Sequence, residues 1–188
     1  MLTLHQYAAL LSLLHDKGRN GTEKIELRPG MGFGALEKWW SHNEMRCRPH
    51  EGVDILCFDD GRRNKHFLGP GGKVPCLLTG EIIAICDDFL GQSVFVKGED
   101  ASLGDIIAVH AHILPQGRCG NRSVVGTEIG VVAPGKGSVP PHLHLSLLRM
   151  PPEFSRTDLH WEFLNQCGQE LFLNPFSEVD SLSVPPVK

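Results

Sequence analysis

Alternating polar and apolar positions predict a half-buried strand at residues 140–148. In a strand, successive side chains point to opposite faces. The leucines at every second position of 143–147 would therefore face a core, while His142, His144 and Ser146 would line the other face. Two imidazoles side by side indicate a metal site or a proton-transfer site. Taken alone, the pair also fits the polar face of an ordinary strand.

The same reasoning predicts short strands through the middle of the chain and a helix at each end. The expected elements are a helix at 3–17, strands at 53–58, 74–88 (bent at Gly80), 92–98, 105–114 and 128–135, and a helix at 156–167 with Thr157 or Asp158 near its cap. Residues 59–73 read as a charged, glycine-rich loop, and the strands at 92–98 and 105–114 as a hairpin. The pattern predicts a mostly β fold with an N-terminal and a C-terminal helix.

Length and composition narrow the function. A chain of 188 residues can build one good core but hardly two domains, and 21 Gly with 13 Pro favour strands joined by tight turns. A net charge of -4 without a basic patch predicts no nucleic-acid partner. No stretch has the length of a membrane span. No signal-peptide pattern is visible, so the chain as given reads as cytoplasmic, as exported by another route, or as lacking a leader that was removed, and its compartment stays open.

Two further motifs add candidate chemistry. Alternation along the predicted strand 105–114 places His110 and His112 together on one face. In "HEGVDI", His50 and Asp54 are four residues apart, and the glycine and β-branched valine between them argue against the helical HExxH zinc motif. On an extended segment, this even spacing also brings both side chains to one side.

Together these motifs supply the parts of a catalytic zinc site. Such sites use three protein ligands and leave a fourth position for water. His50, Asp54 and one imidazole of the pair His142/His144 would fill three positions. The remaining histidines would then handle protons and the charge of the transition state. We expect one Zn²⁺ per chain.

The order and spacing of the motifs resemble the lysostaphin-type (LytM-like) zinc metallopeptidases. "HEGVDI" resembles the first metal motif of that family, "QSVFVKG" with "DIIAVHAHI" its histidine-bearing hairpin, "PHLHLSL" its second metal motif, and "LFLNPF" the Asn-Pro that closes many such domains. The resemblance covers roughly residues 48–178. It implies an antiparallel β-sandwich-like fold with the site in a groove on one sheet.

The resemblance also implies a role for each residue. His50, Asp54 and His144 would be the zinc ligands, and His112 and His142 the catalytic histidines. The implied activity is that of a zinc-dependent endopeptidase, hydrolysing a peptide bond of the kind found in peptidoglycan cross-links. Members of the family usually act outside the cytoplasm.

The chain divides on this basis into three parts. Residues 1–45 form an N-terminal extension that the resemblance does not cover, 46–180 the metallopeptidase-like domain, and 181–188 a tail. Within the extension, Trp39 and Trp40 are interpreted as a packing anchor.

Several alternatives stay open. The chain could be a non-catalytic metal-binding or regulatory domain of the same fold, or a zinc amidase with a cytosolic substrate. A phosphocarrier histidine is disfavoured by the carboxylate of Asp54. Asn43 or His42, just upstream of the first motif, could fold over the metal and block it, and His110 matches no role in the family.

Overall fold

A computed structural model describes residues 1–18, 21–150 and 159–176. Its elements, in chain order, are α1 (Leu4–Leu14), β1 (Lys24–Ile25), β2 (Gly52–Ile55), β3 (Cys57–Asp59), β4 (Lys65–Phe67), β5 (Lys73–Pro75), β6 (Gly80–Asp87), β7 (Gln92–Asp100), β8 (Gly104–Pro115), β9 (Arg122–Ser123), β10 (Glu128–Val132), β11 (Leu143–Arg149), α2 (Trp161–Gln166), the short 3₁₀ helix η2 (Gln169–Leu171) and β12 (Phe172–Leu173). Neither α1 nor α2 has the length and hydrophobicity that a membrane span needs.

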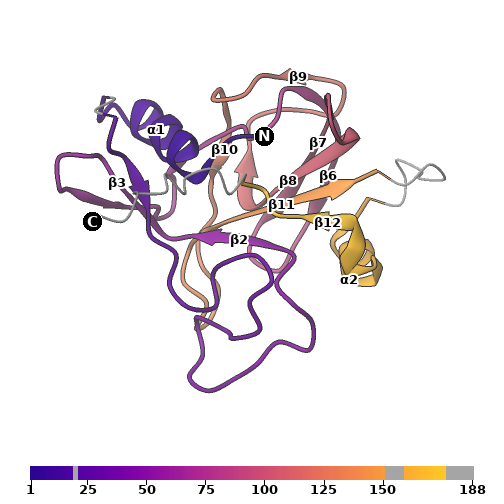
Figure 1. The fold of residues 1–188 in the computed structure, drawn as a ribbon, viewed down its shortest axis with the longest axis horizontal. Coiled ribbons are helices and arrows are strands. Elements are labelled where there is room, and N and C mark those ends of the chain that lie inside the picture. The colour runs from indigo at the N-terminus through magenta and orange to yellow at the C-terminus, as the bar shows by residue number, and fades with distance from the viewer. Residues whose placement is uncertain (19–20, 151–158, 177–188) are drawn as a thin grey trace, which may run out of the picture.

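One large antiparallel sheet organises the described residues. Its strands run in the order β12-β11-β8-β7-β6-β9, with β2 beside β11, and β10 joins β8 to β5. A small second sheet, in the order β1-β3-β4, lies near α1, while α2 lies at the other end of the molecule (Figure 1). The predicted mostly β, antiparallel fold with a helix at each end is therefore confirmed.

The predicted strand at 53–58 is two strands in the structure. β2 pairs with β11 of the large sheet, whereas β3 pairs with β1 and β4 of the small sheet. The chain passes from the large sheet to the small sheet at Leu56, so one continuous apolar run contributes a strand to each sheet. The predicted loop at 59–73 likewise contains β4, which closes the small sheet.

Both predicted helices are present but shorter than expected. α1 begins after Thr3, whose side chain and that of Gln6 form a capping box, and it ends at Leu14. α2 begins at Trp161, with His160 as its N-cap. The predicted cap residues 157 and 158 lie outside the described residues.

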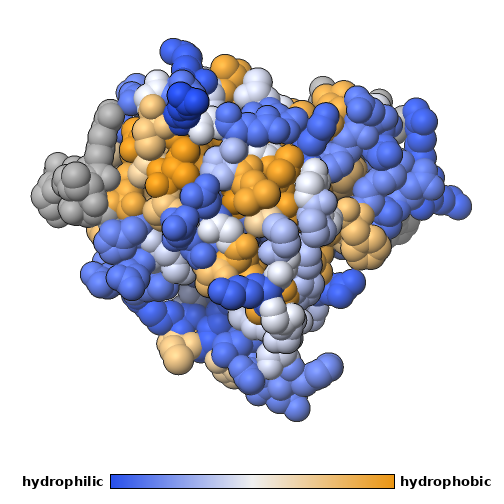
Figure 2. Space-filling model, turned by 180° about the vertical axis from the view of Figure 1, so that it is seen from behind, coloured by the Kyte–Doolittle hydropathy of each residue, from blue (hydrophilic) through white to orange (hydrophobic). Residues whose placement is uncertain are grey.

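Apolar side chains pack on both faces of the large sheet. The main core joins α1, through Tyr7 and Leu11, to the inward side chains of β2 and β11. The second core lies on the opposite face and includes Leu164 of α2. Seen from behind, the surface mixes apolar patches with hydrophilic residues that gather toward the rim (Figure 2). α1 and β11 contribute side chains to the same main core. The predicted division at residues 45/46 stays a prediction.

A β-bulge in β8 separates the two histidines that alternation placed on one face. Val94 of β7 is paired with His110 and Gln92 with Ile113, so two residues of β8 oppose one of β7. His112, inside the bulge, has a left-handed backbone with φ of 64°. The extra residue inverts the alternation, and Ile113 returns to the main core. The prediction that His110 and His112 share a face is wrong for this reason.

His110 is a residue of the main core. Its ring is fully buried, and Nε2 accepts a hydrogen bond of 2.8 Å from the backbone N–H of Leu77. Burial lowers the pKa of His110 to about 4, against a smaller opposing effect of the Val94 backbone. Protonation of the ring would place an N–H on Nε2, directly facing the N–H of Leu77. The folded protein therefore requires neutral His110.

We predict that His110 makes the stability of the protein depend on pH. In an unfolded chain, histidine titrates near its ordinary pKa of about 6.5. Below that value the unfolded state binds more protons than the folded state. The free energy of unfolding should therefore fall as pH decreases from about 6.5 to about 4, by up to about 3 kcal/mol from this residue.

Urea unfolding of the metal-free protein at several pH values measures this effect, with His110→Gln for comparison. The amide oxygen of glutamine can still accept the hydrogen bond from Leu77. Between about pH 4 and 6.5, the free energy of unfolding of the variant should depend less on pH than that of the wild type, by the contribution of one histidine. Equal pH slopes in both proteins would contradict the assignment.

Candidate metal centre

The pairing of β2 with β11 assembles the centre. In this register Asp54 lies directly opposite His144, and Gly52 lies opposite Ser146. A side chain at Gly52 would collide with β11, because its Cβ would overlap the backbone carbonyl oxygen of Leu145 and would come within 2.7 Å of Ser146 Oγ and 2.8 Å of His144 Cε1. The glycine of "HEGVD" therefore lets the two strands approach closely enough for their ligands to meet.

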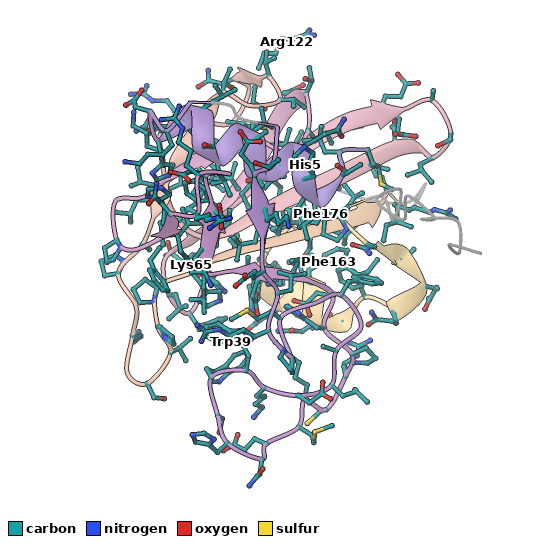
Figure 3. The ribbon with its side chains drawn as sticks, turned by 60° about the vertical axis from the view of Figure 1, so that its left-hand side comes forward. His5, Trp39, Lys65, Arg122, Phe163 and Phe176 are labelled. Carbon is teal, nitrogen blue, oxygen red and sulfur yellow. The ribbon has the colours of Figure 1, made fainter. Side chains whose placement is uncertain are left out.

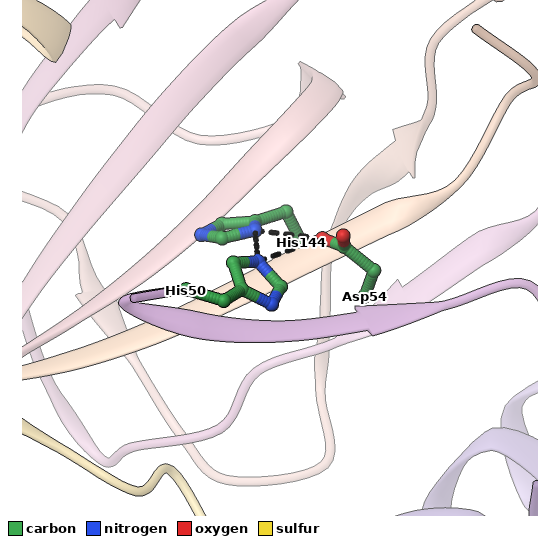
Figure 4. Close-up of side chains that lie close together, drawn as sticks. All are labelled: His50, Asp54 and His144. Carbon is green, nitrogen blue, oxygen red and sulfur yellow. Dashed lines mark hydrogen bonds and ion pairs between the residues drawn. The ribbon is translucent and has the colours of Figure 1, made fainter. Parts of the chain in front are cut away.

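Three buried donor atoms converge at this place, as Figure 4 shows. His144 Nδ1 lies 2.8 Å from Asp54 Oδ1 and 3.2 Å from His50 Nε2, and His50 Nε2 lies 3.4 Å from Asp54 Oδ1. All three residues are at most 3% exposed. The structure thus brings together the three residues that the sequence predicted as metal ligands.

Hydrogen bonds on the outer side fix the orientation of both imidazoles. His50 Nδ1 donates to the carbonyl oxygen of Gly32 at 3.1 Å, which leaves the lone pair on Nε2. His144 Nε2 lies 2.7 Å from the hydroxyl of Ser146 and 3.5 Å from the carboxylate of Glu51, so Nδ1 faces the centre. Outer partners of this kind select the tautomer that a metal ligand needs.

Asp54 carries the charge of the centre. Burial alone would raise the pKa of its carboxyl, but hydrogen bonds with His144 and His50 outweigh burial and hold this pKa well below its ordinary value. Desolvation opposes protonation of His144, yet the same carboxylate raises the pKa of His144. The three residues together prefer a positive charge between them, which a proton or a cation can supply.

The donor set fits zinc. Four ligands placed tetrahedrally at about 2.0–2.1 Å from Zn²⁺ are about 3.3 Å from one another. The three separations in the centre, 2.8, 3.2 and 3.4 Å, lie close to that value. Two imidazole nitrogens and one carboxylate oxygen are ordinary zinc ligands, and three protein ligands leave one position open.

The two predicted catalytic histidines lie beside the ligands. The rings of His112 and His142 meet edge to face with centroids 4.8 Å apart, and His142 Nε2 lies 3.7 Å from Asp54 Oδ1. His142 Nδ1 donates to the carbonyl oxygen of Pro140 at 2.8 Å, so its Nε2 faces the centre. Burial lowers the pKa of His142 to about 4, against the opposing charge of Asp54.

Asp88 orients His112 and was not predicted. Its Oδ1 lies 3.0 Å from His112 Nδ1, and its Oδ2 accepts the backbone N–H of His112 at 2.9 Å. Burial would raise the pKa of Asp88, but hydrogen bonds from His112 and Leu90 lower it below its ordinary range. The carboxylate therefore stays charged and holds the bulge and its imidazole in one orientation. The signal was the turn "DDFLG", in which an Asp bonds backbone groups two residues on.

Aromatic side chains form the walls of the site. A cavity of about 90 Å³ is lined by the three predicted ligands, by both predicted catalytic histidines and by Trp40, Phe89 and Trp161. The indole of Trp39 donates to Asp54, and its ring meets His142 edge to face. The interpretation of Trp39 and Trp40 as an anchor for the extension alone is therefore wrong, because both lie at the centre.

The predicted blocking residues lie away from the centre. His42 and Asn43 are both exposed to solvent, and Asn43 has a left-handed backbone with φ of 62°. The prediction that one of them fills the open position is wrong. The chain between Lys38 and Arg46 turns outward there, and a hydrogen bond from Lys38 N to the Glu44 carbonyl closes the turn.

We predict that the centre binds one zinc ion and that His144→Ala abolishes binding. Loss of an outer partner of a ligand weakens metal binding about 10–100-fold, so loss of a ligand should exceed 100-fold. Elemental analysis and a competing chelator measure stoichiometry and affinity. His42→Ala, which removes an exposed histidine from the same region, should bind as the wild type does. Retention of zinc by His144→Ala would contradict the ligand set.

Comparisons with known proteins agree with this fold. No protein-family model matches the chain, and none of the curated proteins does.

LytU is 17% identical over 77% of this chain and 78% of its own, with a TM-score of 0.50. Lysostaphin, the antimicrobial peptidase from Staphylococcus simulans, is 19% identical over 84% of this chain and 51% of its own, also with a TM-score of 0.50. The catalytic domain of the prophage-encoded M23 protein EnpA from Enterococcus faecalis is 16% identical over 82% of this chain and 98% of its own, with a TM-score of 0.48. The chain shares the fold of LytU and lysostaphin, so the resemblance predicted from the motifs is confirmed in fold.

Proposed function

We propose that this protein is a zinc-dependent endopeptidase that hydrolyses a peptide bond of the peptidoglycan cross-link type. The observation that carries the proposal is that one cavity is lined by His50, Asp54 and His144 together with His112 and His142. A ligand set alone would suit a structural metal. Two further imidazoles, each oriented by an outer acceptor, are what acyl-transfer chemistry requires.

The metal would supply the electrophile. Bound zinc lowers the pKa of a coordinated water to about 7 and polarises a carbonyl oxygen. The donor set leaves a position for that water, because three protein ligands fill only three of the four tetrahedral positions.

The two histidines would move protons and stabilise charge. His112 holds a proton on Nδ1 against Asp88, so Nε2 is free to accept one from the attacking water. His142 is neutral near pH 7, because burial lowers its pKa to about 4. Its Nδ1 keeps a proton and donates it in a hydrogen bond to the Pro140 carbonyl oxygen, and Nε2 lies where it can take up a proton and pass it to the leaving amine.

A second cavity offers a path for the substrate chain. It has a volume of about 240 Å³ and shares Arg46 and Glu51 with the metal cavity. Leu164, Phe172 and Arg48 also line it, and Arg48 donates to the backbone carbonyl of Cys167 at 2.7 Å. An extended peptide that enters the metal cavity would continue into this groove, which favours an endopeptidase over an enzyme for small amides.

We predict that His112→Ala and His142→Ala each lower turnover by about 10²-fold or more while zinc stays bound, since general acid–base groups contribute that much. The assay is release of new amino termini from purified peptidoglycan and from short cross-bridge peptides, with cleavage sites identified by mass spectrometry. Zinc content and the thermal unfolding midpoint of each variant show that metal and fold are intact.

Two results would contradict the proposal. One is a zinc-loaded wild type that cleaves none of these substrates, which would leave a metal-binding module. The other is a cleaving protein whose His112→Ala and His142→Ala variants are as active as wild type. Cleavage of non-peptide amides alone would instead support the amidase alternative.

A further inference from the structure

The segment 28–46, here called the strap, wraps the two ligands of the first motif. The backbone N–H of Asp54 donates to Met31 O at 2.9 Å, and that of His50 donates to Ala35 O at 2.9 Å. The carbonyl oxygen of Gly32, which accepts the hydrogen bond from His50 Nδ1, also belongs to the strap. The strap lies in the region of the chain that the family resemblance does not cover. It nevertheless contacts two of the three ligands directly.

Arg46 closes the strap on itself. Its guanidinium donates to the carbonyl oxygens of Gly30, at 2.8 Å, and of Glu37. Gly30 has a φ of 88°, and a Cβ there would come within 2.7 Å of Glu37 O and 2.9 Å of Trp39 N. The backbone at Gly30 therefore lies against the backbone of Glu37 and Trp39. This contact positions Trp39 beside the centre.

The carboxylate of Asp54 has two distinct sides. Oδ1 faces the donor atoms of His144 and His50, at 2.8 and 3.4 Å. Oδ2 faces the strap, where it accepts the indole N–H of Trp39 at 2.6 Å and lies 3.4 Å from Arg46 Nη2. Figure 3 shows Trp39 where the looped part of the chain meets the sheet. The side chains of Asp54 and Arg46 are only 2% and 11% exposed, so water competes little for these bonds.

We infer that the strap is part of the metal centre and that Trp39 and Arg46 are positioning residues that hold Asp54 as a one-oxygen ligand. This inference rests on the metal site of the proposed function. A carboxylate can bind a metal through one oxygen or through two. With Oδ2 occupied by two strap donors, only Oδ1 is presented to the ion. A fourth position consequently stays available for water.

Trp39 also positions a second group. Its ring lies edge to face against His142, with centroids 5.0 Å apart at an interplanar angle of 86°. One indole thus contacts a metal ligand through its N–H and the neighbouring proton-transfer histidine through its ring. Replacement by phenylalanine separates the two contacts, because it deletes the N–H and keeps an aromatic ring.

The test compares Trp39→Phe with Tyr7→Phe. Tyr7→Phe likewise deletes one hydrogen-bond donor and keeps an aromatic ring, but the Tyr7 hydroxyl donates to the carbonyl oxygen of Pro75 in the main core, so this variant is the matched control. Zinc affinity is measured by chelator competition, and the visible absorption of the Co²⁺-loaded protein reports coordination number. Trp39→Phe should bind zinc about 10–100-fold more weakly and shift the Co²⁺ spectrum toward higher coordination, as expected on loss of an outer partner. Tyr7→Phe should resemble the wild type in both measurements.

A measurement on the unmutated ring covers the case in which Trp39→Phe does not fold. The protein has three tryptophans, so the three indole N–H signals in a ¹⁵N spectrum can be assigned with Trp40→Phe and Trp161→Phe. The Trp39 signal should be shifted downfield and protected from exchange with and without zinc. Rapid exchange of that proton in the zinc-loaded protein would overturn the inference.

The outcomes separate the two proposals. A wild type that binds no zinc would overturn the proposed function and the inference with it. A wild type that binds zinc, with Trp39→Phe equal to it in affinity and in Co²⁺ spectrum, would overturn the inference alone.

Discussion

The register between β2 and β11 is the constraint on which the centre depends. It sets Asp54 opposite His144 although 90 residues separate them in the chain. A slip by one residue would turn Asp54 into the main core and bring Val53 to the centre, because side chains alternate along a strand. Val53 and Ile55, packed in the main core, oppose such a slip. The hydrophobic face of β2 thus determines the chemistry on its other face.

Each polar group of the centre is bonded on its outer side and left free on its inner side. Carbonyl oxygens hold His50 and His142, a hydroxyl and a carboxylate lie at His144, and Asp88 holds His112. These hydrogen bonds offset the loss of hydration on burial, since a buried polar group without a partner is destabilising. On the inner side, His50 Nε2, His144 Nδ1 and Asp54 Oδ1 face one another at 2.8 to 3.4 Å. A shared proton or a cation between them balances their lone pairs.

Local pattern was sufficient to predict that His50, Asp54 and His144 lie together but not what supports them. Alternation along residues 140–148 placed His142 and His144 on one face, and even spacing brought His50 to Asp54, because both depend only on neighbouring residues. The bulge at His112 could not be predicted in this way, since it arises from the pairing of β8 with β7. Trp39 and Asp88 were missed because each meets its partner only in the folded chain, 15 and 24 residues away. The exposed His42 and Asn43 show that closeness in sequence to a motif does not place a residue in the site.

The order of the three predicted ligands along the chain has a consequence for biosynthesis. His50 and Asp54 leave the ribosome 94 and 90 residues before His144. Until β11 has emerged and paired with β2 and β8, two of the three ligands exist without a site. Binding of an ion by all three residues would therefore have to follow this long-range strand pairing, which is costly in chain entropy and slow to form. A ribosome-bound fragment that ends before β11 would lack one of the three donor atoms and so the geometry of the centre.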